Sequence, residues 1–235
     1  SELRLDNVSY IEWSSPCPFD YLSSNQNLSE LACCFKSYTC SCLDLDIVII
    51  TSFVEGFSDN CLTEFDRELV NFKVLSIFYD LIPILNPTLY FSGNLEFEKF
   101  YSSKLKQLKQ LDGLLAISES SANEAQEHLD FNRSFVFNIS SACDKEIFNT
   151  SRKIVYSDAI KPLLEQPFLL YAGAGDSRKN LKGLLEAYSL LPQNLKHFKL
   201  VFAGKLIKPE QELISQWITS YGIDSKNVIQ TGYIS

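Results

Sequence analysis

Short apolar runs rich in β-branched and aromatic residues recur along the chain, and they alternate with segments of helical periodicity. Seven of these runs are long enough for strands: 46–52, 73–80, 113–118, 134–139, 167–173, 199–204 and 227–233. Their apolarity is nearly continuous, which is typical of strands that are covered on both faces in a parallel sheet. Strands that alternate with helices indicate βαβ units, so the sequence predicts an α/β fold with parallel sheets.

Four segments between the runs have the apolar spacing or the end signals of helices. They are 95–111, 121–129, 180–191 and 209–221. Ser121 and Glu124 have the spacing of a capping box, which predicts a helix that opens at Ser121. Pro209 near the start of the last segment and Gly222 after its end fit the usual asymmetry of helix termini.

The stretch 148–166 contains no clear strand and precedes a fresh βαβαβ series. We therefore expect a domain boundary near residue 160, with an N-terminal domain over 1–160 and the first half of a second domain over 161–235. Pro16, Pro18 and the polar run from Ser23 indicate loops, and little structure is assigned to the first 45 residues.

Composition and charge narrow the class of protein. The 235 residues are 46% apolar and 21% charged, as in a globular protein. The net charge of −8 argues against binding of nucleic acid or anionic membranes through a broad basic surface. No apolar run approaches the roughly 18 residues of a membrane span. The chain contains no Met and begins with Ser1, so we expect a piece of a longer protein.

The seven cysteines are an odd number, and five of them lie between Cys17 and Cys42. One residue separates Cys40 from Cys42, which is not the spacing of a zinc ribbon. We expect free, mostly buried thiols in a reducing compartment and no metal site. Neither His128 nor His197 follows a predicted strand, which argues against Ser-His-Asp catalysis.

Ligands of open parallel sheets bind beyond the carboxyl ends of the strands, so the residues that follow each strand are the candidates for a site. The loop 173–180 is the richest of these. Gly173 and Gly175 allow a close backbone approach, and Arg178 and Lys179 stand at the entry of the next helix, where free N–H groups favour an anion such as a diphosphate. The spacing is neither a dinucleotide fingerprint nor a Walker A loop, and a solvated basic turn is the alternative.

Two further strand ends carry polar residues. Asp80 is either a turn-forming residue or a ligand contact. The serines from Ser118 to Ser121 fit a helix N-cap, and a helix N-terminus can also bind an anion.

Three segments in the second half resemble the nucleotide-binding domain of retaining GT-B glycosyltransferases of the glycosyltransferase group 1 family (family 4). They are LLYAGAGDSRKNLKGLLEAYSLLP (169–192), KLVFAGK (199–205) and NVIQTGYIS (227–235). Three earlier segments resemble the acceptor-side domain of the same family: IFYDLIPILNPTLY (77–90), KLKQLKQLDGLLAISESS (104–121) and ACDKEIF (142–148). The resemblance covers roughly residues 44–235.

The resemblance implies an enzyme that transfers a hexose from a nucleotide-diphospho-sugar with retention of anomeric configuration, without a metal or another cofactor. Lys179 matches the family lysine that contacts the donor diphosphate, and Arg178 is its neighbour. Ala174 stands where the family often has a second diphosphate-binding arginine. The other donor-side residues that the resemblance implies are Gly173, Gly204, Lys205, Tyr233 and Ile234.

On the acceptor side, Asp80 matches a position that faces the interdomain cleft, and together with Lys179 it is the expected catalytic residue. Tyr79 stands where many relatives have His. Ser118 and Glu119 match the opposing loop of the cleft. The strand-end residues Ser52, Glu55 and Gly56 complete the expected acceptor side.

The resemblance implies two Rossmann-like domains that face a cleft, both truncated. The family's Gly-rich first loop would precede Ser1, and its spaced pair of glutamates would follow Ser235. The chain alone is therefore expected to be inactive.

The implied function is the building of a polysaccharide by transfer to a glycan or lipid-linked acceptor, in the cytoplasm and in peripheral contact with the inner face of the membrane. The Tyr-Asp-Leu-Ile-Pro segment favours GDP-mannose as the donor. No nucleic-acid partner is expected. Two alternatives are an epimerase or phosphorylase of the same fold, and a degenerate, non-catalytic domain that binds a nucleotide-sugar or a partner.

Overall fold

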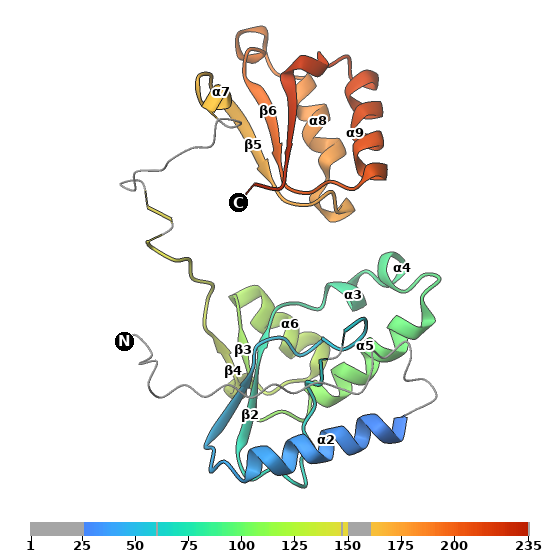
Figure 1. Cartoon of the computed structure of the whole chain (residues 1–235), viewed down its shortest axis with the longest axis vertical. Coiled ribbons are helices and arrows are strands. Elements are labelled where there is room, and N and C mark those ends of the chain that lie inside the picture. Colours follow the sequence, from blue (N-terminus) through green and yellow to red (C-terminus); the bar gives the residue numbers. More distant parts are fainter. Residues whose placement is uncertain (1–25, 60, 147, 150–160, 235) are drawn as a thin grey trace. The chain divides into compact units, whose positions relative to one another are not determined.

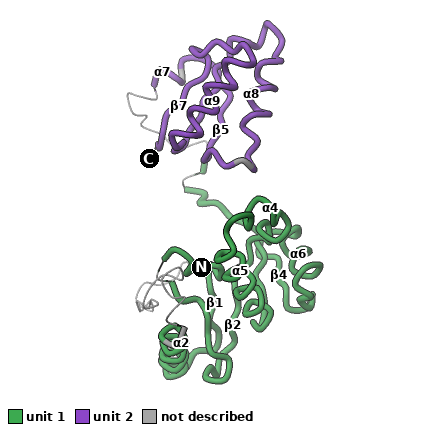
Figure 2. Tube along the Cα trace, turned by 90° about the vertical axis from the view of Figure 1, so that its right-hand side faces the viewer, with its two compact units in different colours: residues 1–148 green, residues 149–235 purple. Residues whose placement is uncertain are grey.

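The structure is a computed structural model that describes residues 26–59, 61–146, 148–149 and 161–234. It divides into two compact units, 1–148 and 149–235, which Figure 2 shows in different colours. The domain boundary expected near residue 160 falls in the stretch 150–160, outside the described residues.

Unit 1 contains a four-stranded parallel sheet with the order β1-β2-β3-β4 (Figure 1). Its strands are β1 (Ile47–Ile50), β2 (Lys73–Phe78), β3 (Gly113–Ala116) and β4 (Val136–Asn138). Its helices are α2 (Gln26–Ser41), α3 (Ile82–Leu85), α4 (Pro87–Tyr90), α5 (Leu95–Leu108) and α6 (Glu119–Leu129), with a 3-10 turn at Arg133–Phe135.

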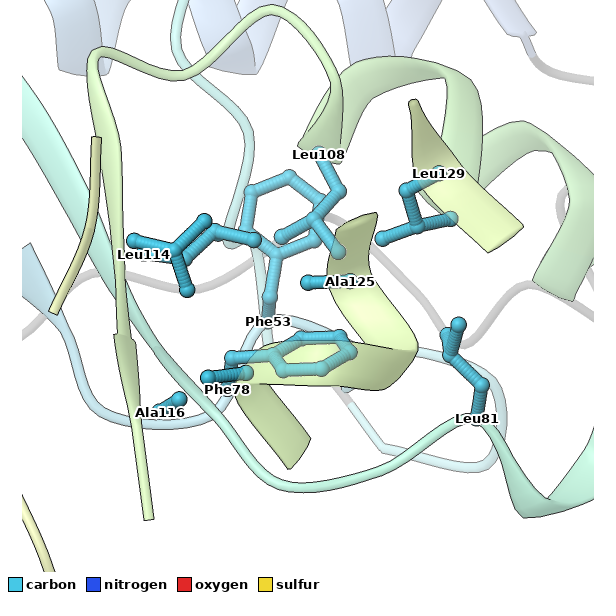
Figure 3. Packing of buried hydrophobic residues seen from close by; sticks show 10 residues of the cluster. Phe53, Phe78, Leu81, Leu108, Leu114, Ala116, Ala125 and Leu129 are labelled. Atoms are coloured by element: carbon cyan, nitrogen blue, oxygen red, sulfur yellow. The ribbon is translucent and has the colours of Figure 1, made fainter. Parts of the chain in front are cut away.

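One face of this sheet forms the core of unit 1 with α5 and α6. Figure 3 shows Phe78 of β2 and Leu114 of β3 close to Leu108 of α5 and Ala125 of α6. Phe53, from the loop after β1, belongs to the same buried cluster. Since neighbouring strands are in register, every second side chain on each strand faces the two helices.

The opposite face of the sheet is apolar but only partly covered. Ile47, Ile49 and Phe137 are each about half exposed. The expectation that both faces are covered is therefore wrong for the described part of unit 1. A continuous apolar run shows that both faces of a strand are apolar, but it does not show which element, if any, covers each face.

Unit 2 contains a three-stranded parallel sheet with the order β5-β6-β7. Its strands are β5 (Phe168–Ala172), β6 (Lys199–Ala203) and β7 (Val228–Gly232). Its helices are α7 (Lys161–Leu164), α8 (Leu181–Ser189) and α9 (Lys208–Ser220), with 3-10 turns at Ser177–Lys179, Gln193–Leu195 and Ser225–Asn227. Leu185, Leu200, Phe202 and Ile214 are the centre of a core between the sheet and the helices α8 and α9.

All seven predicted strands are confirmed, and so are the helices expected over 95–111, 180–191 and 209–221. The capping box at Ser121 is wrong in its position. The N-cap of α6 is Ser118, whose hydroxyl accepts the Ser121 N–H at 3.1 Å. Glu124 instead accepts the Leu81 N–H at 2.9 Å, so it connects α6 to the end of β2.

The prediction of loops within the first 45 residues is wrong in part, because residues 26–41 form the helix α2. This helix has an unusual pattern of burial. Lys36 and Ser37 are buried, whereas Phe35 and Tyr38 are more than half exposed. The Lys36 ammonium donates to the Leu62 carbonyl at 2.8 Å, and burial lowers the pKa of Lys36 to about 8.

The described cysteines differ from the expectation of mostly buried thiols. Cys33, Cys34 and Cys40 are half-buried, and the other three are exposed. All six are free thiols, and Cys17 lies outside the described residues. Among the helices that the structure describes, none is long and apolar enough to cross a membrane.

Candidate functional site

The carboxyl edge of the sheet in unit 2 is made of glycine backbone. Gly173, Gly204 and Gly232 end or follow the three strands, and all have positive φ angles. The Gly173 N–H donates to the Ala203 carbonyl at 2.9 Å, and the Gly204 N–H donates to the Gly232 carbonyl at 3.0 Å. A Cβ atom on Gly204 would lie 2.2 Å from the Gly173 carbonyl oxygen, so only glycine fits there. Three strand ends thus form a smooth backbone edge that a ligand can approach closely.

The loop after β5 is stabilised by Asp176 and Arg178. The Asp176 carboxylate accepts the Arg178 backbone N–H at 2.8 Å and the guanidinium Nη2 at 2.7 Å. These hydrogen bonds lower the pKa of Asp176 to about 2. The charge of Arg178 is therefore largely compensated within its own loop.

Lys179 differs from its neighbour. Its side chain is exposed, and among the residues that the structure describes no salt bridge involves it. It directly precedes Asn180, whose side chain accepts the Gly183 N–H at 3.2 Å and caps α8. Lys179 thus presents an exposed cation beside a helix N-terminus, and both features favour an anion.

Tyr171 and Glu210 support the loop after β5. The Tyr171 hydroxyl donates to the Ala174 carbonyl at 2.6 Å. Glu210, from the first turn of α9, accepts the Ile207 N–H at 2.8 Å. A Cβ atom on Gly175 would lie 2.3 Å from the Glu210 carboxyl carbon, so glycine at 175 leaves room for this carboxylate. The loop is therefore preorganised by contacts from β5 and α9.

The other donor-side candidates lie at the following strand ends. Lys205 directly follows Gly204 and is exposed. Tyr233, with 81% of its surface exposed, and the less exposed Ile234 follow β7. The structure places all three at the same edge of the sheet as Gly173 and Lys179, because the carboxyl ends of parallel strands meet at one edge.

Unit 1 has a cavity of about 240 Å³ at the carboxyl ends of β1 and β2. Phe53, Phe78, Leu81 and Leu108, which Figure 3 shows in the core, form part of its wall. Its polar lining residues are Ser52, Tyr79, Asp80 and Tyr101. The two expected acceptor-side residues Ser52 and Asp80 are therefore brought together.

Asp80 has the turn-forming role that the sequence left open. Its Oδ1 accepts the Ile82 N–H at 3.0 Å, and this bond starts the turn into α3. Its carboxylate is exposed and also lines the cavity, so the turn fixes the side chain without burying it. A ligand contact at Asp80 is compatible with this geometry.

Glu55 and Gly56 shape the loop after β1. The Ser52 hydroxyl donates to the Glu55 carboxylate at 2.6 Å. Gly56 is buried with φ of 102°, and a Cβ atom there would lie 2.5 Å from the Cys61 carbonyl oxygen. Both residues thus support the loop that carries Ser52.

The two candidates at the start of α6 are already engaged by the protein. Ser118 caps the helix, and the Ser121 hydroxyl donates to the Tyr79 carbonyl at 2.5 Å. Glu119 forms an ion pair with Arg133 at 2.9 Å and accepts a hydrogen bond from Asn138 at 3.2 Å. A ligand role for Glu119 stays a prediction.

Sequence reasoning did not identify three residues that the structure brings to these edges. Gly232 could have been found from its place at the end of a predicted strand. Asp176 carries the signal of an Asx turn two residues before Arg178. Nothing in the local sequence distinguishes Tyr101 from the other apolar positions of its helix. Its contact with the cavity depends on how the helix packs in the fold.

The fold and the two edges define a class of protein: two Rossmann-like units, one with a glycine-rich loop and two basic residues at its carboxyl edge and one with a small cavity at the corresponding edge. This is the arrangement of a GT-B glycosyltransferase. Residues 156–235 match the family model described as "Glycosyl transferases group 1".

Relatives extend the likeness to most of the chain. Over 194 residues, which are 81% of the chain, it is 37% identical to a "Serotype-specific mannosyltransferase WbdA" from Escherichia coli. Over 238 residues and the whole chain it is 31% identical to another protein of that name and organism. The chain spans 24% and 29% of the lengths of these relatives.

Solved structures agree on the fold. A structure of Anabaena Alr3699/HepE in complex with UDP has a TM-score of 0.61 at 15% identity, over 95% of this chain and 55% of that chain. A glycosyltransferase from Rickettsia africae has a TM-score of 0.60 at 18% identity, over 91% of this chain and 53% of its own. The predicted GT-B fold and the resemblance to group 1 glycosyltransferases are confirmed.

Proposed function

We propose that the full-length protein that carries this chain is a retaining mannosyltransferase that moves a sugar from a nucleotide-diphospho-sugar to a glycan or lipid-linked acceptor. The observation that supports this most strongly is the exposed Lys179 cation at the start of α8, beside the glycine edge of unit 2. The names of the E. coli relatives support mannose as the sugar and polysaccharide biosynthesis as the process. The epimerase, phosphorylase and non-catalytic alternatives are not favoured by these comparisons.

The role of unit 2 is electrostatic. As the bond to the sugar breaks, negative charge develops on the leaving nucleoside diphosphate. The free N–H groups in the first turn of α8 are held in place by the helix before the reaction begins, so they stabilise this charge without reorganising, and the exposed Lys179 ammonium adds a positive charge beside them. Asp176 keeps Arg178 in the loop, which leaves Lys179 as the principal cation for the diphosphate.

Neither a metal nor another cofactor is part of this proposal. Lys179 and Lys205 are cations at the same edge, and they supply the positive charge that a divalent ion would otherwise provide. Donor binding therefore rests on side chains of unit 2, with Tyr233 and Ile234 beside the nucleoside.

Unit 1 binds the acceptor in this proposal. Its cavity of about 240 Å³ is smaller than the roughly 300–1,000 Å³ of sites for drug-sized ligands, so it fits a single sugar ring. Asp80 is the acidic group at its rim. Peripheral contact of the full-length enzyme with the inner face of the membrane would give it access to a lipid-linked acceptor.

Replacement of Lys179 tests the donor site. In the full-length protein, Lys179→Ala is expected to reduce sugar transfer by about 10²-fold, by analogy with the loss of one preorganised donor. Calorimetric titration with GDP should show weaker binding by the same variant. Lys196→Ala is the matched control, because Lys196 is exposed in the connection before β6, away from the carboxyl edge of the sheet, and its loss should leave both measurements unchanged. Wild-type transfer and wild-type GDP affinity in Lys179→Ala would contradict the assignment.

A further inference from the structure

Tyr101 is a largely buried tyrosine that lines the cavity of unit 1. Its side chain is 3% exposed, and it reaches the cavity of unit 1 from α5. Phe91 and Phe97 hold its ring, each with a centroid distance of 5.9 Å. Among the residues that the structure describes, none forms a hydrogen bond with this hydroxyl. The hydroxyl is not sealed in the core but lies against the cavity, so a molecule in the cavity can be its hydrogen-bond partner.

The surroundings of Tyr101 point to a ligand inside the cavity. Asp80 lines the same cavity, and the negative charges of Asp80 and Glu124 lie close enough to act on the phenol. Burial and these two carboxylates raise the pKa of Tyr101, so the phenol is neutral at physiological pH. A neutral phenol both donates and accepts a hydrogen bond.

The rest of the lining fits a sugar. Apolar side chains such as Val54, Leu81 and Pro83 suit the C–H face of a pyranose ring. The polar lining residues are few: Ser52, Tyr79, Asp80 and Tyr101. An apolar pocket with a small number of placed polar groups is the usual form of a selective small-molecule site.

We propose that Tyr101 is an acceptor-specificity residue, which hydrogen-bonds one hydroxyl of the acceptor sugar while Asp80 binds another. This inference rests on the proposed glycosyltransferase function. It names the acceptor as a sugar whose terminal ring enters the cavity of unit 1 and presents separate hydroxyl groups to Asp80 and Tyr101. Tyr101 positions the acceptor, and it takes no part in the bond-making step.

Tyr101→Phe in the full-length protein separates this role from a structural one. The substitution removes only the hydroxyl and keeps the ring between Phe91 and Phe97. Because that hydroxyl makes no hydrogen bond within the protein, the melting temperature should stay the same or rise. The KM for the acceptor should rise about 3- to 15-fold, as for the loss of one hydrogen bond, with the KM for the donor unchanged.

Tyr188→Phe is the matched control. The Tyr188 hydroxyl is also in a part-buried position, but it donates to the Phe198 carbonyl at 2.6 Å in unit 2. Its removal should lower the melting temperature and leave the acceptor KM unchanged. We thus expect Tyr101→Phe to change the acceptor KM without lowering the melting temperature, and Tyr188→Phe to lower the melting temperature without changing the acceptor KM.

A series of monodeoxy acceptors identifies the sugar hydroxyl that Tyr101 binds. In the wild-type protein, the acceptor KM should rise when the hydroxyl bound by Asp80 is removed, and also when one other hydroxyl is removed. In Tyr101→Phe, removal of that second hydroxyl should cause no further rise in the acceptor KM. Wild-type transfer with equal acceptor KM values and equal deoxy profiles in both proteins would overturn the role of Tyr101. Absence of sugar transfer by the wild-type protein would instead overturn the proposed function and, with it, this inference.

Discussion

Two adjacent basic residues, Arg178 and Lys179, have different roles in the structure. Both read as anion-binding residues in the sequence, because both stand at the entry of a helix. The Asp176 carboxylate binds the Arg178 guanidinium and backbone, so Arg178 shapes the loop. Lys179 keeps its charge available to a ligand. A single carboxylate two residues upstream therefore decides which of the two cations serves the site.

The Asp176–Arg178 pair should give unit 2 a pH-dependent stability. The folded-state pKa of Asp176 is about 2, below its ordinary value of 3.8. The contribution is therefore complete above about pH 4 and is lost as the pH falls toward 2. Both side chains are partly exposed, so solvent screening limits it to below about 1 kcal/mol.

Asp176→Asn tests this contribution. Denaturant unfolding at pH 7 should show a lower stability for the variant than for the wild type, and the two proteins should converge near pH 2. A constant difference between pH 7 and pH 2 would show that the carboxylate charge is not the cause.

At the scale of elements, the ends of the three strands in unit 2 are specified by close backbone packing. Gly204 has φ of 143°, and any side chain there would meet the Gly173 carbonyl oxygen. Gly222, after α9, also has a positive φ of 63°, but no atom lies within 4 Å of its Cβ position. The two glycines therefore differ in packing, and both have a positive φ that disfavours other residues.

This difference predicts unequal costs of substitution. Gly204→Ala should destabilise unit 2 by roughly 2–4 kcal/mol, because strain and a backbone clash add together. Gly222→Ala should cost about 1–2 kcal/mol, the penalty of a positive φ alone. Thermal or denaturant unfolding measures both. Equal costs for the two variants would mean that the strand edges relax to accept a side chain.

Helix α2 shows why one element was not predicted. Amphipathic periodicity assumes that apolar residues are inside, whereas α2 buries Lys36 and Ser37 and exposes Phe35 and Tyr38. The buried polar groups are satisfied by the loop 62–66: Lys36 donates to Leu62, and the Ser37 hydroxyl accepts the Asp66 N–H at 2.8 Å. Partners about 30 residues away cannot be seen in a local pattern.

For the whole molecule, the sequence was sufficient for the α/β class and for the strand ends that carry the candidate site. Long β-branched runs indicate strands wherever they lie, and the carboxyl ends of parallel strands share an edge. Ser52 and Asp80 could thus be placed together from the sequence. The contribution of Tyr101 could not be predicted, because it depends on which side chains the fold brings beside it, whereas the contact of Asp176 with Arg178 is local and has the sequence signal of an Asx turn.

Both units therefore present their candidate residues at the same kind of edge, with basic residues and glycine backbone in one and a small cavity in the other. This difference in chemistry underlies the proposed assignment of the donor to unit 2 and of the acceptor to unit 1.

Sugar transfer by the full-length protein tests the central claim most directly. The protein is incubated with GDP-mannose and a mannoside acceptor, and the anomeric signal of the product is recorded by NMR. We predict a new mannoside that keeps the α configuration of the donor, together with release of GDP. A β-linked product would contradict the retaining reaction, and the absence of transfer from GDP-mannose and from other nucleotide-sugars would contradict the glycosyltransferase function itself.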